Sequence, residues 1–210
     1  MPTIDQTRSW YPYFDPVHGF DHILRVLRLA ERLAAAEGAD LEVVRAAALL
    51  HDASGAETGG AGRAEHQHHS ADFAKEVLVA EGWPLERIAA VQHCIRAHRF
   101  RGDESPQTIE AKVLFDADKL DVIGAFGVAR TLGYDVVMGW PFYAEPSQQF
   151  KETGKKEEGE RHSSYHEYLF KLGKIKDRLQ TATGRKLAQE RQAFMNAFFE
   201  QLDAEARGER

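Results

Sequence analysis

The chain has 210 residues, of which 43% are hydrophobic and 29% are charged, as in one soluble domain with a sizeable core, or one domain with helical additions. The formal net charge is -6 and the lysines and arginines are scattered, which argues against a long nucleic acid as partner but not against a small phosphorylated ligand. Cys94 is the single cysteine, so no intrachain disulfide can form. The first residues lack the apolar core of a signal peptide and no stretch reaches roughly 20 apolar residues, so we expect a cytoplasmic protein without membrane contact.

The first part of the chain is predicted to be helical, because its apolar residues recur every three or four positions. The expected helices cover about 22–38, 41–52, 69–81 and 84–98, then a segment that opens at Thr108 and carries Asp116 and Asp118, and finally 122–132. Between the second and third helices, residues 55–62 are small and rich in glycine. Such a loop can move, or can let a ligand approach the backbone.

The helical pattern fails between about 133 and 161, where Pro141, Pro146, several aromatic residues and the charged run 151–158 occur. We expect an ordered lid in the first half of this segment and a mobile second half. Two further helices are predicted at about 163–179 and 184–206. The sequence shows no strand pattern and therefore predicts an all-α fold in a single domain, with a core at about 18–132, a long irregular segment and C-terminal helices at about 163–206.

Potential metal ligands stand where predicted helices leave the core. His51 and Asp52 end the apolar run 43–50, His22 precedes them and Asp118 follows them, each on its own helix. Imidazole and carboxylate ligands without cysteine suit Mn, Mg, Fe, Co, Ni or Zn better than they suit a thiolate-bound structural zinc. Successive helical residues differ by about 100° in direction, so His51 and Asp52 can share an ion only if it lies between them, as at a helix end.

This order of residues, His, His-Asp and Asp, resembles the HD-domain superfamily of metal-dependent phosphohydrolases. The stretches 69–71, 95–98, 110–121, 124–130, 166–172 and 188–195 are similar to a bacterial branch that includes YedJ and YpgQ, so that the likeness extends from about 18 to 202. The resemblance implies an HD-type helical bundle with one divalent ion bound by His22, His51, Asp52 and Asp118. Some members of the branch hydrolyse nucleoside triphosphates to the monophosphate and pyrophosphate with a manganese-type ion, which makes manganese the favoured metal.

An ion in such a site can lower the pKa of bound water, to about 7 in the case of zinc, and so supports hydrolysis of a phosphoanhydride or phosphoester. Asp52, Arg25 and Lys119 are the candidate catalytic residues, since developing charge on the phosphoryl oxygens needs donors near the metal. The candidate substrate-binding residues are His69, Arg96, His98, Arg130 and Lys171.

Several of these residues have a second interpretation. His69 and His98 could hold a second ion, although we favour one. Arg130, Lys171 and Lys176 are distal phosphate or base clamps, or equally well ordinary solvated positions. Asp121 is interpreted as a helix cap in preference to a base.

Other residues are interpreted structurally. We interpret His18 as an outer residue or the start of a helix, and His66 and His68 as exposed. The stripe formed by Phe194, Phe198 and Phe199 is either core or a homodimer face. The alternative to an enzyme is a non-catalytic module in which the metal organises a nucleotide-sensing pocket, and the weakest alternative is a purely structural helical protein.

Overall fold

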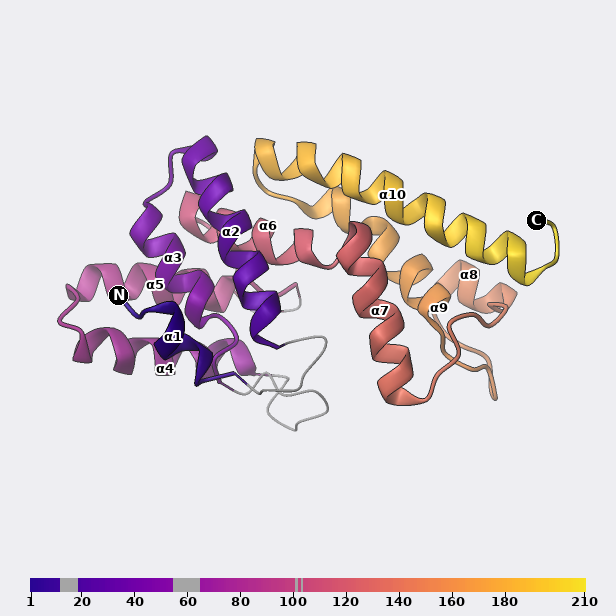
Figure 1. Cartoon of the computed structure of the whole chain (residues 1–210), viewed down its shortest axis with the longest axis horizontal. Coiled ribbons are helices and arrows are strands. Elements are labelled where there is room, and N and C mark those ends of the chain that lie inside the picture. The colour runs from indigo at the N-terminus through magenta and orange to yellow at the C-terminus, as the bar shows by residue number, and fades with distance from the viewer. Residues whose placement is uncertain (12–18, 55–64, 101, 103) are drawn as a thin grey trace. The chain divides into compact units, whose positions relative to one another are not determined.

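The computed structural model describes residues 1–11, 19–54, 65–100, 102 and 104–210. Every regular element in these ranges is a helix and none is a strand, which confirms the all-α prediction (Figure 1). None of the described helices is both long enough and apolar enough to cross a membrane. The chain divides into two compact units, the first formed by Met1–Lys119 with Gln180–Gly184 and the second by Leu120–Leu179 with Arg185–Arg210.

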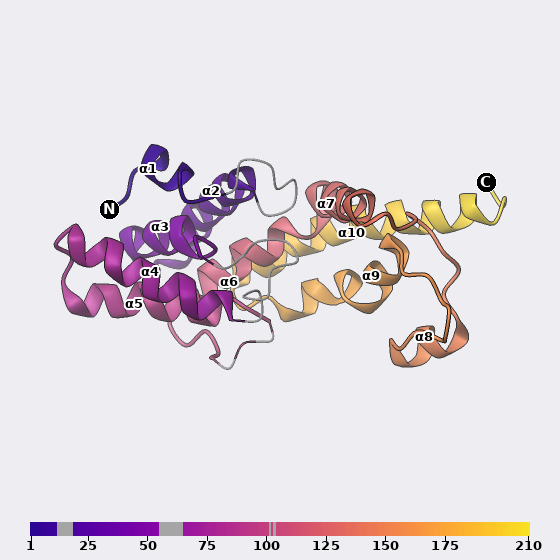
Figure 2. The same cartoon turned by 90° about the horizontal axis from the view of Figure 1, so that it is seen from below.

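The first unit is built around a buried helix. Its helices are α1 (Ile4–Arg8), α2 (Phe20–Glu37), α3 (Leu41–Leu50), α4 (His66–Ala80), α5 (Leu85–Ala97) and α6 (Ile109–Asp121), the last two residues of which already belong to the second unit. Helix α3 packs against α2 and α5, and α4 lies along α5 (Figures 1 and 2). Since α3 has buried residues on nearly every side, it is the core helix of this unit.

The ends of α3 are set by local chemistry. Its N-cap, Asp40, accepts hydrogen bonds from the backbone N–H groups of Glu42 and Val43. At the other end, the N–H of Ala53 bonds to the carbonyl of Leu50 in a turn, so that the helix ends at Leu50. His51 and Asp52 therefore lie just beyond the last helical residue, whereas the sequence predicted that the helix includes them.

Residues 180–184 are attached to α6 through one carboxylate. Asp116 accepts hydrogen bonds from the backbone N–H groups of Gln180 and Thr181, both at 2.7 Å, and from the hydroxyl of Thr181 at 2.6 Å. A Cβ atom at Gly184 would lie 2.2 Å from Oδ2 of Asp116, so only glycine fits this position without displacing that carboxylate. Asp116 is thus a structural residue of the helix that also carries Asp118.

The second unit contains more helix than the sequence predicted. Its elements are α7 (Gly124–Met138), α8 (Gln148–Thr153), α9 (Ser164–Phe170), the 3-10 helix η2 (Leu172–Arg178) and α10 (Ala182–Ala206), which belongs to this unit from Arg185 onward. Helix α7 runs past residue 133 to the left-handed Gly139, and α8 begins at the Ser147 cap. The helix expected at 163–179 is divided into α9 and η2.

The segment that is predicted to be mobile, the second half of 133–161, contains one carboxylate that bonds to neighbouring elements. Glu160 accepts hydrogen bonds from the backbone N–H and hydroxyl of Ser147 at 2.8 and 2.7 Å, from the N–H of Glu157 at 2.6 Å and from Nε2 of His166 at 2.9 Å. These bonds tie the segment to α8 and α9. A polar run that looks solvated in the sequence is therefore anchored at its end.

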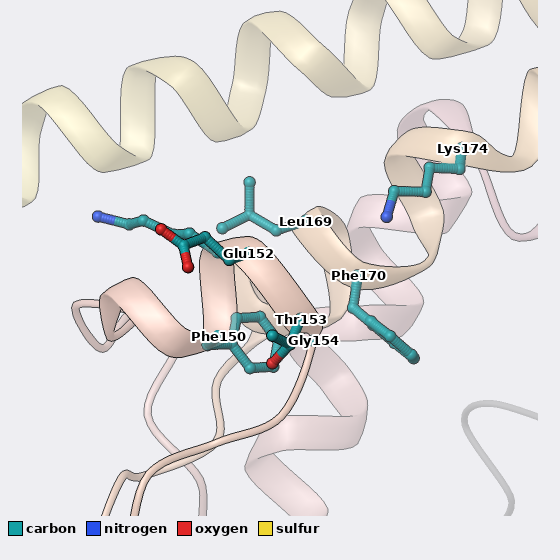
Figure 3. Close-up of a pocket in the computed structure, with 8 residues that line it drawn as sticks. Phe150, Glu152, Thr153, Gly154, Leu169, Phe170 and Lys174 are labelled. Carbon is teal, nitrogen blue, oxygen red and sulfur yellow. The ribbon is translucent and has the colours of Figure 1, made fainter.

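A hollow in the second unit lies between α8 and the segment that α9 and η2 form. Phe150, Gly154 and Phe170 line it together with Lys174 (Figure 3). None of the predicted site residues is in its lining. The hollow therefore adds nothing to the predicted chemistry.

Candidate metal centre

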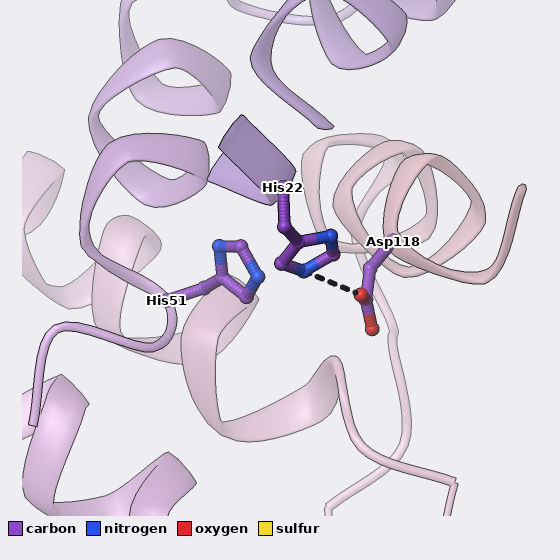
Figure 4. A group of neighbouring side chains, drawn as sticks. All are labelled: His22, His51 and Asp118. Carbon is purple, nitrogen blue, oxygen red and sulfur yellow. Dashed lines mark ion pairs between the residues drawn. The ribbon is translucent and has the colours of Figure 1, made fainter. Parts of the chain in front are cut away.

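Three of the four predicted ligands converge in the first unit. His22 from α2, His51 from the end of α3 and Asp118 from α6 each offer a ligand atom, and these atoms all lie within 4.8 Å of one another (Figure 4). Nε2 of His22 lies 3.4 Å from Oδ1 of Asp118. All three residues are buried. Helices that are remote in sequence thus aim nitrogen and oxygen ligands at one place.

Asp52, the fourth predicted ligand, lies between this cluster and a second one. Its Oδ2 atom is 3.7 Å from Nε2 of His51, whereas its Oδ1 atom is 3.2 Å from Nε2 of His66 and 3.5 Å from Nε2 of His98. Asp52, His66 and His98 form a second group whose ligand atoms also lie within 4.8 Å of one another. The two oxygens of Asp52 therefore face the two groups.

The imidazoles of His51 and His98 are oriented in the same way. Each residue is the C-cap of its helix, and its Nδ1 atom bonds to the backbone carbonyl three residues earlier, Ala48 at 2.9 Å and Ile95 at 2.5 Å. A carbonyl accepts, so Nδ1 carries the proton in both rings, and in the neutral ring of His51 Nε2 keeps a free lone pair. Nε2 of His51 is buried without a hydrogen-bond partner among the described residues. Such an inward, unprotonated nitrogen fits a metal ion.

The protonation states of the candidate ligands also favour metal binding. Burial lowers the pKa of His51 to about 4, against the opposing charge of Asp52, so the ring is neutral at pH 7. Burial alone would raise the pKa of Asp118, but Lys119 and His22 outweigh it, and the pKa of this carboxyl falls well below its usual range. The pKa of Asp52 falls likewise, because His51, His66 and His98 outweigh its burial. Neutral imidazoles and ionised carboxylates are the forms that bind divalent cations.

Lys119 is the predicted cation closest to the ligands. It is buried, and its ammonium donates to Oδ2 of Asp118 at 2.6 Å. The same ammonium lies 5.0 Å from the ring centre of Phe100 and 5.5 Å from that of Phe115. Arg25 is half-buried on α2, one turn beyond His22. The structure therefore places Lys119 against a ligand and Arg25 on a ligand-bearing helix.

Two predicted substrate-binding residues of the first unit are placed differently. His69 is exposed and belongs to neither ligand group. The guanidinium of Arg96 bonds through Nε to Glu104 at 2.5 Å, and Glu104 also bonds to His93. Glu104 thus pairs with Arg96, and this ion pair connects α5 to the segment before α6.

The two remaining candidates, Arg130 and Lys171, lie in the second unit. Arg130 and Asp121 form an ion pair of 2.6 Å between side chains that are 10% and 1% exposed. The N-cap of α7 is Ile123, which makes no side-chain capping bond, so the prediction that Asp121 caps this helix is wrong. Lys171 pairs with Glu167 one turn earlier, at 2.9 Å on the surface.

The sequence-based interpretation missed His66. It was expected to be exposed, but its side chain is 12% exposed and faces Asp52 and His98. Helix α4 begins at His66, three residues earlier than predicted, and so His66 and not His69 stands at its head. His18 and the glycine-rich loop 55–62 lie outside the described residues.

Comparison with known proteins agrees with this geometry. The HD domain model matches residues 19–123. The uncharacterized protein YpgQ of Bacillus subtilis is 33% identical over 212 residues, which cover 97% of this chain and 94% of YpgQ. Its crystal structure in complex with ADP is similar over 97% of both chains, with a TM-score of 0.74 and 32% identity.

An HD-superfamily hydrolase from Bacillus thuringiensis is a more distant structural relative. It is 28% identical, with a TM-score of 0.65 over 97% of this chain and 96% of its own. The matched domain contains His22, His51, Asp52 and Asp118, all of the predicted ligands. This protein therefore belongs to the HD-domain family.

Proposed function

We propose that this protein is a metal-dependent phosphohydrolase that cleaves a phosphoanhydride or phosphoester bond in a small phosphorylated metabolite, with a nucleotide as the favoured substrate. The observation that carries the proposal is the buried Nε2 atom of His51, which finds no hydrogen-bond partner in the part of the chain that the structure describes and lies beside His22, Asp118 and Asp52. Leaving a polar atom unpaired in a protein interior is costly, so an unpaired nitrogen beside three other potential ligands supports a bound ion at this place.

The proposed cofactor is one divalent ion, manganese by preference, held by His22, His51, Asp52 and Asp118. When bound, such an ion lowers the pKa of a coordinated water and polarises a phosphoryl oxygen. No cysteine takes part, which agrees with an ion that prefers nitrogen and oxygen. His66 and His98 face the other oxygen of Asp52.

The remaining chemistry is assigned to residues near the ligands. Lys119 brings a buried positive charge to the edge of the cluster, where it can stabilise charge that develops on phosphoryl oxygens. Arg25 is proposed for the same role. Asp52, ionised at neutral pH, can accept a hydrogen bond from the attacking water and so orient it.

A nucleotide is favoured because YpgQ, which resembles this chain over nearly its full length, has been crystallised with ADP. Release of pyrophosphate from a nucleoside triphosphate is the specific reaction that we propose. The scattered distribution of lysine and arginine favours a small substrate over a long nucleic acid, and we propose a cytoplasmic location.

The test is a panel of nucleotides and sugar phosphates with metal-free protein and added Mn²⁺. Phosphate is assayed with and without a coupling pyrophosphatase, which separates pyrophosphate release from phosphate release. Asp52→Ala should abolish turnover and tight metal binding. Asp21→Asn, which alters an exposed carboxylate beside His22, is the control and should retain both. Full activity of Asp52→Ala would disprove the proposal.

The alternative is a nucleotide-sensing module without turnover. The free lone pair of His51 and the ionised ligand carboxylates are compatible with binding alone. Tight nucleotide binding with no product under any of the six candidate metals would favour this function. Turnover with any of them would exclude it.

A further inference from the structure

The N-terminal segment, residues 1–11, is connected to several ligand-bearing helices. Its helix α1 begins with a capping box between Thr3 and Gln6. Beyond α1, the ring of Trp10 packs edge-on against Phe73 of α4 with centroids 5.2 Å apart. The guanidinium of Arg8 lies 4.5 Å from the ring centre of Phe20, the first residue of α2. The segment is therefore an ordered part of the first unit.

Tyr11, at the end of this segment, is bonded to the C-terminal turn of α3. Its side chain is buried, and its hydroxyl donates to the carbonyl of Leu49 at 2.8 Å. Carbonyls in the last turn of a helix lack partners from within the helix, so this bond satisfies one of them. Leu49 lies two residues before His51. Burial and the charge of Asp52 raise the pKa of the Tyr11 phenol, while a hydrogen bond from the backbone N–H of Asp52 opposes the rise.

The same side chain also contacts the start of α2. The ring of Tyr11 packs against Phe20 with centroids 5.7 Å apart, and Phe20 lies two residues before His22. Both aromatic side chains are 7% exposed. One residue outside the ligand set therefore touches the two helix ends that present His22 and His51.

We propose that Tyr11 is a positioning residue that fixes the backbone at His51 and Asp52 so that both side chains can reach one ion. This inference rests on the proposed function. Helix ends fray, and these two ligands lie beyond the last helical residue, where intrahelical bonds no longer hold them. Two successive residues can share an ion only in a narrow range of backbone directions, and the Tyr11 hydroxyl restricts that range through Leu49. Outer partners of metal ligands contribute about 10- to 100-fold to affinity.

The test compares two variants that each lose one buried hydroxyl. Tyr11→Phe keeps the ring and its contact with Phe20 but loses the bond to Leu49. Thr7→Val is the matched control, because the Thr7 hydroxyl donates at 2.8 Å to Thr3 within the same segment. The Kd for Mn²⁺ is measured by titration calorimetry on metal-free protein, at a temperature where circular dichroism shows each variant to be folded. Tyr11→Phe should weaken binding about 10-fold, and Thr7→Val should leave it within about 2-fold of wild type.

Amide hydrogen exchange supplies a readout without metal. Peptides that cover 49–54 should exchange faster in metal-free Tyr11→Phe than in wild type or Thr7→Val. Unchanged metal affinity in Tyr11→Phe, or an equal loss in both variants, would overturn the inference. So would a Tyr11→Phe chain that does not fold, because the hydroxyl would then support the whole unit. Failure of the wild-type protein to bind any of the six candidate metals would instead remove the proposed function.

Discussion

The ammonium of Lys119 donates a hydrogen bond to Oδ2 of Asp118 at 2.6 Å, and Oδ1 of the same carboxylate faces His22. Both side chains are 11% exposed, so the pair is largely removed from water. A carboxylate shared in this way keeps its negative charge, which a metal ligand requires. The arrangement also holds a positive charge within reach of anything that binds beside Asp118.

Lys119→Met should separate catalysis from metal binding. Loss of the ammonium removes a charge that stabilises the phosphoryl oxygens, so kcat should fall about 100-fold. Binding of Mn²⁺ should change far less, because all four ligands remain. Steady-state kinetics and titration calorimetry measure the two effects, and Lys119→Arg should recover part of kcat. A variant with wild-type kcat would show that Lys119 has only a structural role.

One ion per chain is expected after metal loading and desalting. The group formed by Asp52, His66 and His98 has three protein donors and shares Asp52 with the first group, so it should lose its ion more readily. Elemental analysis of wild type and of His98→Gln measures the stoichiometry. Two ions in wild type and one in His98→Gln would contradict the prediction and assign the second ion to this group.

The metal-free protein should lose stability as the pH falls from about 6.5 to about 4. His51 has a folded pKa of about 4, whereas in the unfolded chain its pKa is about 6.5. The unfolded state therefore takes up a proton first, and protonation favours unfolding across this window. Urea denaturation at pH 7, 5.5 and 4 measures the slope, which should be shallower in His51→Gln. His69→Gln, at an exposed histidine, is the control. A shallower slope in His69→Gln but not in His51→Gln would contradict the assignment of the effect to His51.

Glu160→Gln should lower the melting temperature at pH 7, and the deficit should shrink as the pH falls from about 4.5 towards 2. Burial raises the pKa of Glu160, but the hydrogen bonds from Ser147, Glu157 and His166 outweigh it and lower the pKa to about 2. A group whose pKa is lower in the folded state stabilises the protein at pH values above its unfolded pKa. This stabilisation is lost when the pH falls below its folded pKa. Thermal melts at several pH values test this. The exposed Glu158→Gln should show no such trend, and a constant deficit in Glu160→Gln would refute the explanation.

The elements predicted best were those that depend on local patterns. Apolar spacing located α2, α3 and α5, and the order of histidines and aspartates led to the three converging residues in Figure 4. Each of these signals lies within one helix or one short motif. The sequence therefore sufficed for the fold class and for the first ligand group.

Features that depend on pairing between distant residues were not predictable in this way. The bond from Tyr11 to Leu49 spans 38 positions, and no periodicity reveals it. The ion pair between Arg96 and Glu104 was likewise not evident from the sequence. His66 was missed because the start of α4 was placed one turn too late. Side-chain partners, unlike helices, are decided by tertiary packing.

The imidazoles of His51 and His98 are each hydrogen-bonded to their own helix, so the direction in which each ring points is set locally. His51 and His98 are each held by a carbonyl only three residues upstream. A core substitution that slides one helix along another would carry the ring with the helix end as a rigid body, without rotating it. Substitutions between packed helices would therefore shift the two imidazoles slightly and leave their orientation unchanged. A cation with adaptable coordination tolerates such a shift better than it tolerates lone pairs that point away from it.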